Sequence, residues 1–279
     1  MHTTRWKRPG SVLCLAAALM AGAAVRPESA FTPTAPASPR RSTDGPLTGF
    51  ACKVGPGIPI ANGHMYSINF DTGTTVDLGL PVGGVGVQGL AWDPTTSRLY
   101  GMTIANPQTG RARLLDLTVM PGTEIGQPFM VGYGLGFSRS PANGKFYAVV
   151  YTGGLAFLYD INVTTAASLL IGMDTATSVD GFAIDAQGQG YAAGFGPFQH
   201  QFYRVDLATG KFTTVGPLNH GLTGSVPCGL AFDPSGTLWA LSSGTDPSRL
   251  YNIDLQTGNA VFIRTVANSG WYGALEVVP

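Results

Sequence analysis

Five short apolar runs of the form Gly-Leu-Ala-Phe-Asp recur along the chain. Each is followed by an aromatic run and then by a stretch such as Leu-Tyr-Asn-Ile-Asp at residues 250–254. Apolar and polar positions alternate in these stretches, as they do in a β-strand with one buried face. Each repeat therefore predicts four strands: the glycine-led run as the innermost strand, the aromatic run, the Leu-Tyr-x-Ile-Asp run, and an outer strand such as residues 212–215. The runs begin at Gly89, Gly134, Gly181, Gly229 and Gly273, so the repeat steps are 45, 47, 48 and 44 residues.

A period in the forties made of short strands is typical of a β-propeller, in which each repeat forms one four-stranded antiparallel blade. The last repeat, residues 273–279, supplies an innermost strand alone. The first begins near residue 47 with strand-like runs at 49–54, 63–70 and 74–80. We therefore expect the final strand to complete the N-terminal blade, which leaves no open edge between the first and last blades. The sequence predicts one five-bladed domain over residues 47–279.

The first 46 residues have a different composition. A basic start is followed by a run of alanine and leucine that is too short to span a bilayer, so residues 1–30 are interpreted as a secretory signal. Residues 31–46 are rich in Pro, Ser and Thr and predict a flexible or extended leader. We expect the mature protein to be secreted or periplasmic, with no transmembrane segment.

The charge balance excludes some partners. The chain carries 16 basic and 16 acidic residues, and removing residues 1–30 leaves a net charge of about −3. This gives no basic footprint for nucleic acid or an anionic membrane. Charged residues make up 11% of the chain, and its 39 glycines suit the many tight turns of an all-β protein.

Runs such as Gly-Leu-Ala-Phe-Asp-Pro at residues 229–234 and Leu-Tyr-Asn-Ile-Asp-Leu-Gln-Thr-Gly at 250–258 carry a family resemblance. They resemble the repeats of secreted bacterial propeller proteins with LYxIDxxTG-type motifs, over about residues 47–279. The resemblance implies the propeller and export. It brings no catalytic residues to this chain.

One polar column is interpreted as structural. Asn and Asp interchange at the same repeat position, which fits a side chain that bonds nearby backbone N–H groups and starts a turn. A catalytic acid would not be needed five times. The column consists of Asn69, Asp116, Asn162, Asp206 and Asp254.

Propeller ligands are expected over the central axis, near the loops that enter the innermost strands. These loops are residues 80–88, 126–133, 172–180, 216–228 and 266–272, and their last residues differ in chemistry between repeats. Such a ring suits a small polar ligand; the alternative is that its members bond adjacent loops and plug the channel. The candidate ligand-binding residues are Gln88, Tyr133, Asp180, Cys228 and Tyr272, with His220 and Trp271 in the same loops.

Other chemistry has little support in the sequence. Asp174 and Asp180 share one loop and are weak candidates for Ca²⁺, but the EF-hand spacing is absent, so no metal or other cofactor is predicted. Glu276 stands in an apolar column with Trp92, Phe137, Ile184 and Phe232. If buried, its pKa would be raised; the simpler expectation is that the last strand bends or shifts and leaves Glu276 solvated or ion-paired.

Two cysteines remain after removal of the signal. Cys52 and Cys228 fall at the same end of neighbouring blades, and an oxidising compartment would permit a disulfide between them. The bond requires Cα geometry that the sequence does not give.

Two functions from different classes follow. The first is a secreted or periplasmic binding module whose loop face takes a small polar ligand, a carbohydrate or a surface protein. The alternative is an extracytoplasmic hydrolase or lyase acting on a sugar or lactone, with Asp180 or His220 as acid or base. General acid–base work needs a positioned pair, which the sequence does not show; a purely structural surface protein is the third hypothesis.

Overall fold

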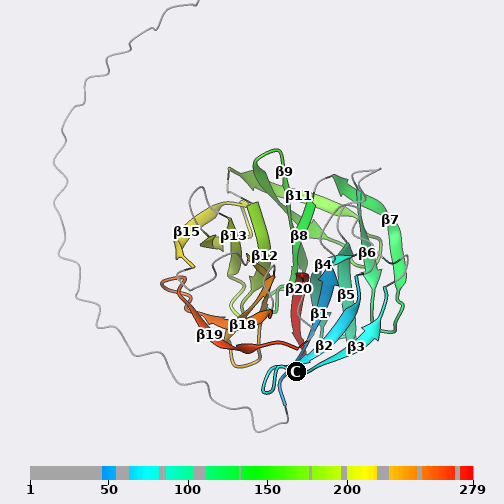
Figure 1. Ribbon diagram of the computed structural model, residues 1–279. Helices are drawn as coiled ribbons and strands as arrows, with labels where there is room; N and C mark the ends of the chain where they lie inside the picture. Colours follow the sequence, from blue (N-terminus) through cyan, green and yellow to red (C-terminus); the bar gives the residue numbers. More distant parts are fainter. Residues whose placement is uncertain are drawn as a thin grey trace, which may run out of the picture. The chain divides into compact units, whose positions relative to one another are not determined.

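The described part of the chain is built from β-strands, as the computed structural model in Figure 1 shows. The structure describes residues 46–54, 63–81, 84, 86–103, 111–131, 133–175, 178–195, 200–218, 226–243, 247–267 and 271–278. For residues 54, 129–131, 133–135, 195, 226–228, 243 and 271 it describes the backbone alone. The predicted signal and almost all of the predicted leader lie outside the described residues. Nowhere in the described ranges is there a helix long and apolar enough to cross a membrane.

The strands pair into five four-stranded antiparallel blades, as predicted. Blade I contains, in order, β20 (Trp271–Val278), β1 (Thr48–Val54), β2 (Met65–Asn69) and β3 (Thr75–Gly79). Blade II contains β4 (Val87–Asp93), β5 (Arg98–Thr103), β6 (Arg111–Asp116) and β7 (Thr123–Val131). Blade III contains β8 (Tyr133–Arg139), β9 (Phe146–Thr152), β10 (Leu155–Ile161) and β11 (Ser168–Asp174). Blade IV contains β12 (Ser178–Ile184), β13 (Gly190–Phe195), β14 (His200–Val205) and β15 (Phe212–Pro217). Blade V contains β16 (Val226–Phe232), β17 (Leu238–Ser243), β18 (Arg249–Ile253) and β19 (Ala260–Thr265).

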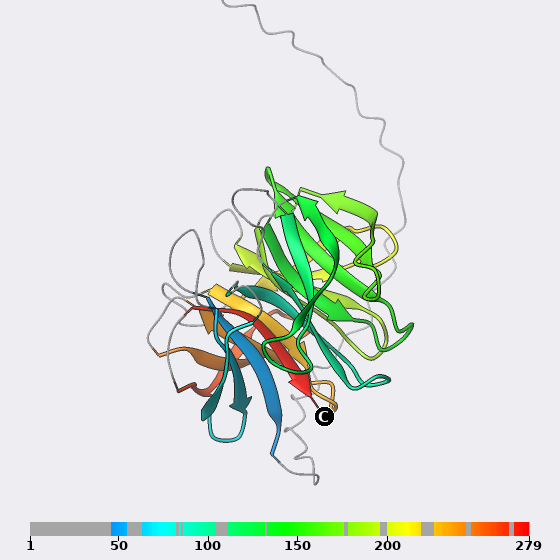
Figure 2. The same ribbon diagram turned by 90° about the vertical axis from the view of Figure 1, so that its right-hand side faces the viewer.

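The ring closes through the C-terminal strand, which confirms the predicted seam. β20 pairs with β1 from Thr48 opposite Val278 to Val54 opposite Trp271. Figures 1 and 2 show red β20 beside blue β1 from the other end of the chain. This pairing leaves no unpaired edge at the junction of the two ends. The protein is a five-bladed β-propeller.

The innermost strands surround the propeller axis. Contacts run from β20 to β4, β8, β12 and β16 and back to β20, so each innermost strand contacts its two ring neighbours. β4 and β16, which are not ring neighbours, still have Cα atoms within 8 Å of one another. Apolar clusters fill the spaces between successive blades. The core therefore lies between the blades, and the axis is narrow.

The repeat register differs from the sequence prediction in two blades. Gly136, rather than Gly134, is equivalent to Gly89, because each lies beside the next blade in the same way: a Cβ at Gly89 would meet Phe137 and one at Gly136 would meet Phe182. In blade I the equivalent residue is Ala274, one position after Gly273, as its pairing with Cys52 shows. The sequence Gly134-Leu135-Gly136 offers two alignments, and the glycine that packs against the next blade is the second.

The polar turn column has the predicted structural role. Asn69 Oδ1 accepts hydrogen bonds from the backbone N–H groups of Asp71 and Thr72 at 2.9 and 3.0 Å. The other four members make the same kind of bond two residues ahead. These side chains initiate the turns from the third to the outer strand. Each side chain of this column therefore accepts a hydrogen bond from the backbone of its own turn.

Candidate functional site

A β-bulge interrupts every innermost strand at its loop end. One residue on each of these strands has no partner on the second strand, while the residues on either side of it are paired. A bulge bends a strand locally and re-aims the side chain of the extra residue. The unpaired residues are Gln88, Leu135, Asp180, Cys228 and Gly273.

The neighbours of Gln88 determine where its side chain is directed. Val87 packs in the cluster between blades I and II, whereas the α-carbon of Gly89 faces Phe137 of blade III. Both faces of β4 are thus occupied, and β5 lies along one edge. From these neighbours we infer that the Gln88 side chain is directed to the free edge of β4, on the side of the axis. Its Oε1 atom is buried and has no hydrogen-bond partner among the described residues.

Asp180 occupies the equivalent position on β12. Val179 packs in the cluster between blades III and IV, and Ala183, two residues beyond Gly181, packs in the cluster between blades IV and V. The same argument directs Asp180 to the axis. The residue is partly buried, and burial raises the pKa of its carboxyl to about 6. Asp180 therefore changes charge close to neutral pH, whereas an ordinary aspartate is ionised well below it.

The predicted ring is corrected in one general respect: its residues do not end loops but lie inside the innermost strands, because the strands begin before the repeat glycine. Gln88, Asp180 and Cys228 stand at bulges, and Cys228 is described by its backbone alone. Tyr133 and Trp271 are the first residues of β8 and β20, again with the backbone alone described. The ring positions predicted for Tyr133 and Tyr272 are taken, at the bulges of β8 and β20, by Leu135 and Gly273. His220 lies outside the described residues.

Tyr272 belongs to the core. Its side chain is fully buried in the cluster between blades V and I, and its ring meets that of Tyr66 edge-on at 6.1 Å between centroids. The hydroxyl donates a hydrogen bond to the carbonyl of Ala267 at 3.4 Å. Burial raises the pKa of this phenol above its usual range. Complete burial leaves Tyr272 no exposed surface for a ligand, so Gln88 and Asp180 carry the axial candidate.

Asp174 connects two blades. Its Oδ1 accepts the N–H of Thr175 at 2.7 Å, and its Oδ2 accepts the N–H of Phe212, at the start of β15, at 2.9 Å. Both carboxylate oxygens thus hold backbone donors, which gives Asp174 a structural role between blades III and IV. No cluster of three metal-ligating His, Cys, Asp or Glu side chains occurs within the described ranges. The weak candidacy of Asp174 and Asp180 for calcium stays untested.

Cys52 is a free and fully buried thiol. Its Sγ accepts a hydrogen bond from the N–H of Val87 at 3.3 Å and donates to the Lys53 carbonyl at 3.8 Å. Burial raises the thiol pKa to about 12. The side chain of Cys228 lies outside the description, and the predicted disulfide is not formed at Cys52 in this structure. A buried thiol with a raised pKa is a poor nucleophile.

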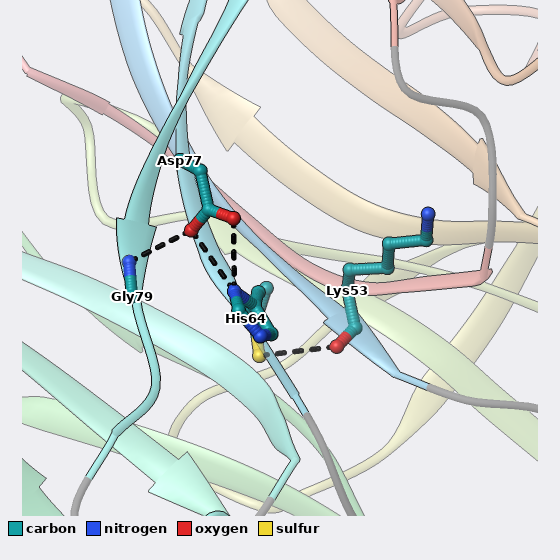
Figure 3. Close-up of polar contacts among 5 residues, drawn as sticks. Lys53, His64, Asp77 and Gly79 are labelled. Carbon is teal, nitrogen blue, oxygen red and sulfur yellow. Dashed lines mark hydrogen bonds and ion pairs between the residues drawn. The ribbon is translucent and has the colours of Figure 1, made fainter.

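A polar cluster on blade I, which contains His64 and Asp77, was not predicted from the sequence. His64 Nδ1 lies 3.0 and 2.9 Å from the two carboxylate oxygens of Asp77, and Asp77 Oδ1 accepts the N–H of Gly79 at 2.8 Å (Figure 3). The hydrogen bond with His64, followed by that with Gly79, lowers the pKa of Asp77. Tyr66 also bonds this carboxylate. The pairing of Tyr66 with Asp77 across β2 and β3 is the signal that could have found the cluster.

The blade I cluster is not a nucleophilic triad, although a cysteine, a histidine and an aspartate occur in one blade. Cys52 and Met65 pack between blades I and II, whereas Tyr66 packs between blades V and I. The thiol and the His64–Asp77 pair therefore lie on opposite faces of the blade I sheet. Both members of the pair are substantially exposed, with side-chain exposures of 37% and 47%. Exposed pairs of this kind contribute little to stability.

The last strand shifts its register, as the simpler expectation held, but Glu276 is partly buried toward the junction between blades I and II rather than solvated. The register shift at Gly273 places it opposite Phe50, in the column of small residues rather than the predicted apolar column. Its counterparts in the other blades are Ala91, Ser138, Ala183 and Ala231, each opposite an aromatic residue. Burial raises the pKa of the Glu276 carboxyl well above its usual range, and a hydrogen bond with the Trp92 backbone offsets part of this effect.

Comparison with known proteins identifies similarities of fold. No family model and no curated protein matches the chain. The chain resembles one in a crystal structure of a nidogen/laminin complex, with a TM-score of 0.54 and 13% identity over 84% of this chain and 99% of that chain. It also resembles TolB from Acinetobacter baumannii, with a TM-score of 0.49 and 15% identity over 78% of this chain and 53% of that chain. A protein from Lactobacillus plantarum gives a TM-score of 0.48 and 10% identity over 84% of this chain and 100% of that chain.

Proposed function

We propose that the protein is a secreted or periplasmic binding module whose ligand site lies at the loop end of the propeller axis, around Gln88 and Asp180. The ligand is a small polar molecule that donates hydrogen bonds, and a carbohydrate is the class that fits this chemistry. The expected export rests on the apolar run within residues 1–30. Fold alone does not select a function, so the proposal depends on the site.

The observation that carries the proposal is the unpaired amide oxygen of Gln88. It is buried, has no hydrogen-bond partner among the described residues, and stands at a bulge directed to the axis. A buried acceptor without a donor costs about 1–3 kcal/mol, and such groups in proteins usually have an explanation in a ligand, ion or water. A ligand hydroxyl would supply the missing donor.

Asp180 adds a second acceptor at an equivalent bulge. A partly buried carboxylate gains more from a donor than an exposed one, because hydrogen bonds to charged groups are the stronger ones. The Asn and Asp side chains of the turn column, in contrast, already accept backbone N–H bonds. Gln88 and Asp180 thus supply two polar acceptors at equivalent bulges of the innermost strands, which a hydroxyl-rich ligand could bridge.

A hydrolase or lyase acting on a sugar or lactone is the second candidate. One observation favours it: with a pKa of about 6, Asp180 could exchange a proton near neutral pH, as a general acid or base must. The reaction also needs a second catalytic group within hydrogen-bonding reach. Turnover of a lactone or glycoside, lost in Asp180→Asn, would establish this activity over simple binding.

A thermal-shift screen tests the binding site. The protein is screened against mono- and oligosaccharides, polyols, lactones and Ca²⁺, because a ligand at a hundredfold excess over its Kd stabilises the native state by about 2.7 kcal/mol. We expect a saccharide or polyol to raise the Tm, and we expect Gln88→Leu and Asp180→Asn each to reduce this rise by about half or more, as tenfold weaker binding requires.

Asp254→Asn is the matched control for the screen, because Asn already occupies the same turn position at Asn69 and Asn162. It should keep the full ligand-induced rise. A flat response across the panel, or a rise that is undiminished in both axial variants, would contradict the axial site. A flat response would direct attention to surface proteins as partners.

A further inference from the structure

The junction between blades I and II differs from the other four inter-blade spaces. Each of the others contains at least three buried aromatic side chains, as Tyr100, Phe137 and Phe146 illustrate between blades II and III. The buried members between blades I and II are Cys52, Met65, Val87, Leu90, Leu99, Leu115, Leu117 and Ala274, with no aromatic ring among them. The two rings that pack against this cluster, Phe50 and Trp92, are only partly buried, and the space is incompletely filled.

A cavity of about 690 Å³ occupies this junction. Its inner wall is formed by buried Met65, Leu99 and Leu117. Exposed Ser97 and Thr118, both in turns, lie at its mouth. A volume of this size falls within the range of about 300–1,000 Å³ that is typical of small-molecule sites.

The indole of Trp92 brings a polar group to this apolar wall. Trp92 lines the cavity, and its Nε1 is buried with no hydrogen-bond partner among the described residues. Trp239 on blade V shows the ordinary situation, since its Nε1 donates to Asp233 Oδ2 at 3.0 Å. A buried indole N–H normally has an acceptor. Because Nε1 is shielded in this structure, an oxygen acceptor in the cavity would satisfy Trp92 once the indole ring turns toward the cavity.

The lining also restricts the charge of an occupant. None of the described residues that line the cavity is Lys, Arg, His, Asp or Glu. Two of the three lining hydroxyls have partners: Thr48 Oγ1 donates to the Pro46 carbonyl at 3.3 Å, and Thr118 Oγ1 accepts the N–H of Leu99 at 3.2 Å. An anionic ligand would lose its hydration without gaining an opposite charge, and a cationic ligand would have only the nearby Glu276, whose ionised form is disfavoured by burial. A neutral ligand avoids this cost.

We propose that the cavity between blades I and II is a second binding site, separate from the axial one, for a neutral and mainly apolar small molecule with a ring and one carbonyl or ether oxygen. The ring packs against the partly buried rings of Phe50 and Trp92, in the space that fully packed aromatic side chains fill in the other junctions. The oxygen accepts the hydrogen bond of Trp92 Nε1. The mouth lies among the turns, so this site and the axial site open at opposite ends of the blades.

Fluorescence titration with prodan, a neutral naphthyl ketone, tests this proposal. We expect saturable binding with a blue-shifted prodan emission, because the dye leaves water for an apolar cavity. Leu78→Trp places a larger side chain on the cavity wall and should abolish binding. Trp92→Phe keeps the ring but removes the N–H, and should weaken binding roughly five- to tenfold.

Trp239→Phe is the matched control, because it removes an indole N–H that already has its acceptor in blade V. It should bind prodan like the unmodified protein. Absence of saturable binding, or unchanged binding in Leu78→Trp, would overturn the site. An unchanged affinity in Trp92→Phe would overturn the assigned donor and with it the ligand class.

Discussion

Phe137 lies directly against the α-carbon of Gly89 in the neighbouring blade: a Cβ at position 89 would come within 2.5 Å of the Phe137 Cβ. The same relationship joins Gly136 to Phe182 at 2.3 Å and Gly229 to Leu275 at 2.5 Å. These distances are shorter than carbon atoms tolerate without displacement. The innermost strands are therefore held together at positions where a side chain has no room, and this close approach explains the repeat glycine.

We expect Gly136→Ala to destabilise the protein by about 1–3 kcal/mol, because the methyl group would meet Phe182 Cβ and backbone atoms that cannot move independently. Urea denaturation measures the change. Ala274→Gly is the matched control at the equivalent position of blade I, where a Cβ already fits, and it should cost no more than about 1 kcal/mol. Equal and small effects in both variants would show that the blades are not closely packed here.

The blade architecture could be predicted from sequence because it depends on local patterns. Alternating apolar residues, turn residues and the period in the forties specify the strands, the five blades and the closure by β20. The register of single residues was harder to predict from the sequence. Gly134 and Gly136 fit the repeat equally well in sequence, and only contact with Phe182 distinguishes them.

The candidate site was predicted only in part, because it depends on the register of single residues. Gln88 and Asp180 were found because they precede a correctly aligned glycine. Tyr272 was misplaced because a one-residue shift moves a side chain to another face of a strand. The cavity beside Trp92 arises from side-chain volumes across a junction between distant segments, which a sequence pattern does not show.

Asp180→Asn should change the pH dependence of stability. Below about pH 4 Asp180 is protonated in both the native and the unfolded state. Between about pH 4 and 6 the unfolded state loses the proton first, so the native state of the unmodified protein loses up to about 3 kcal/mol as pH rises through this window. The Asn variant lacks this loss. Denaturant titrations of both proteins at pH 4 and pH 8 measure it; a stability difference that does not change with pH would contradict the raised pKa.

Cys52 should resist alkylation in the native protein, because it is fully buried and its pKa is raised to about 12. After unfolding in denaturant without reductant, iodoacetamide should modify it completely. Peptide mass spectrometry of the Cys52 peptide gives the readout. Modification that requires prior reduction would instead demonstrate a disulfide, with Cys228 as the expected partner.

At Asp254 in the turn column, substitution by Ala should lower the stability more than substitution by Asn. Asp254→Ala removes the acceptor of the Gln256 and Thr257 N–H groups, bonded at 2.8 and 2.9 Å, and should cost roughly 1 kcal/mol. Asp254→Asn keeps the acceptor and should cost less than about 0.5 kcal/mol. Thermal unfolding of the two variants measures the difference. Equal destabilisation would show that charge, rather than hydrogen bonding to the turn, is what this position requires.

Proton-linked calorimetry tests the axial ligand site most directly. The first ligand from the thermal-shift screen is titrated at pH 6 in two buffers that differ in ionisation enthalpy. Donors from the ligand would stabilise the Asp180 carboxylate, so we predict proton release on binding to the unmodified protein. Asp180→Asn should release no proton and bind roughly tenfold more weakly or worse. Binding that releases no proton and is equally tight in Asp180→Asn would contradict a site built on this carboxylate.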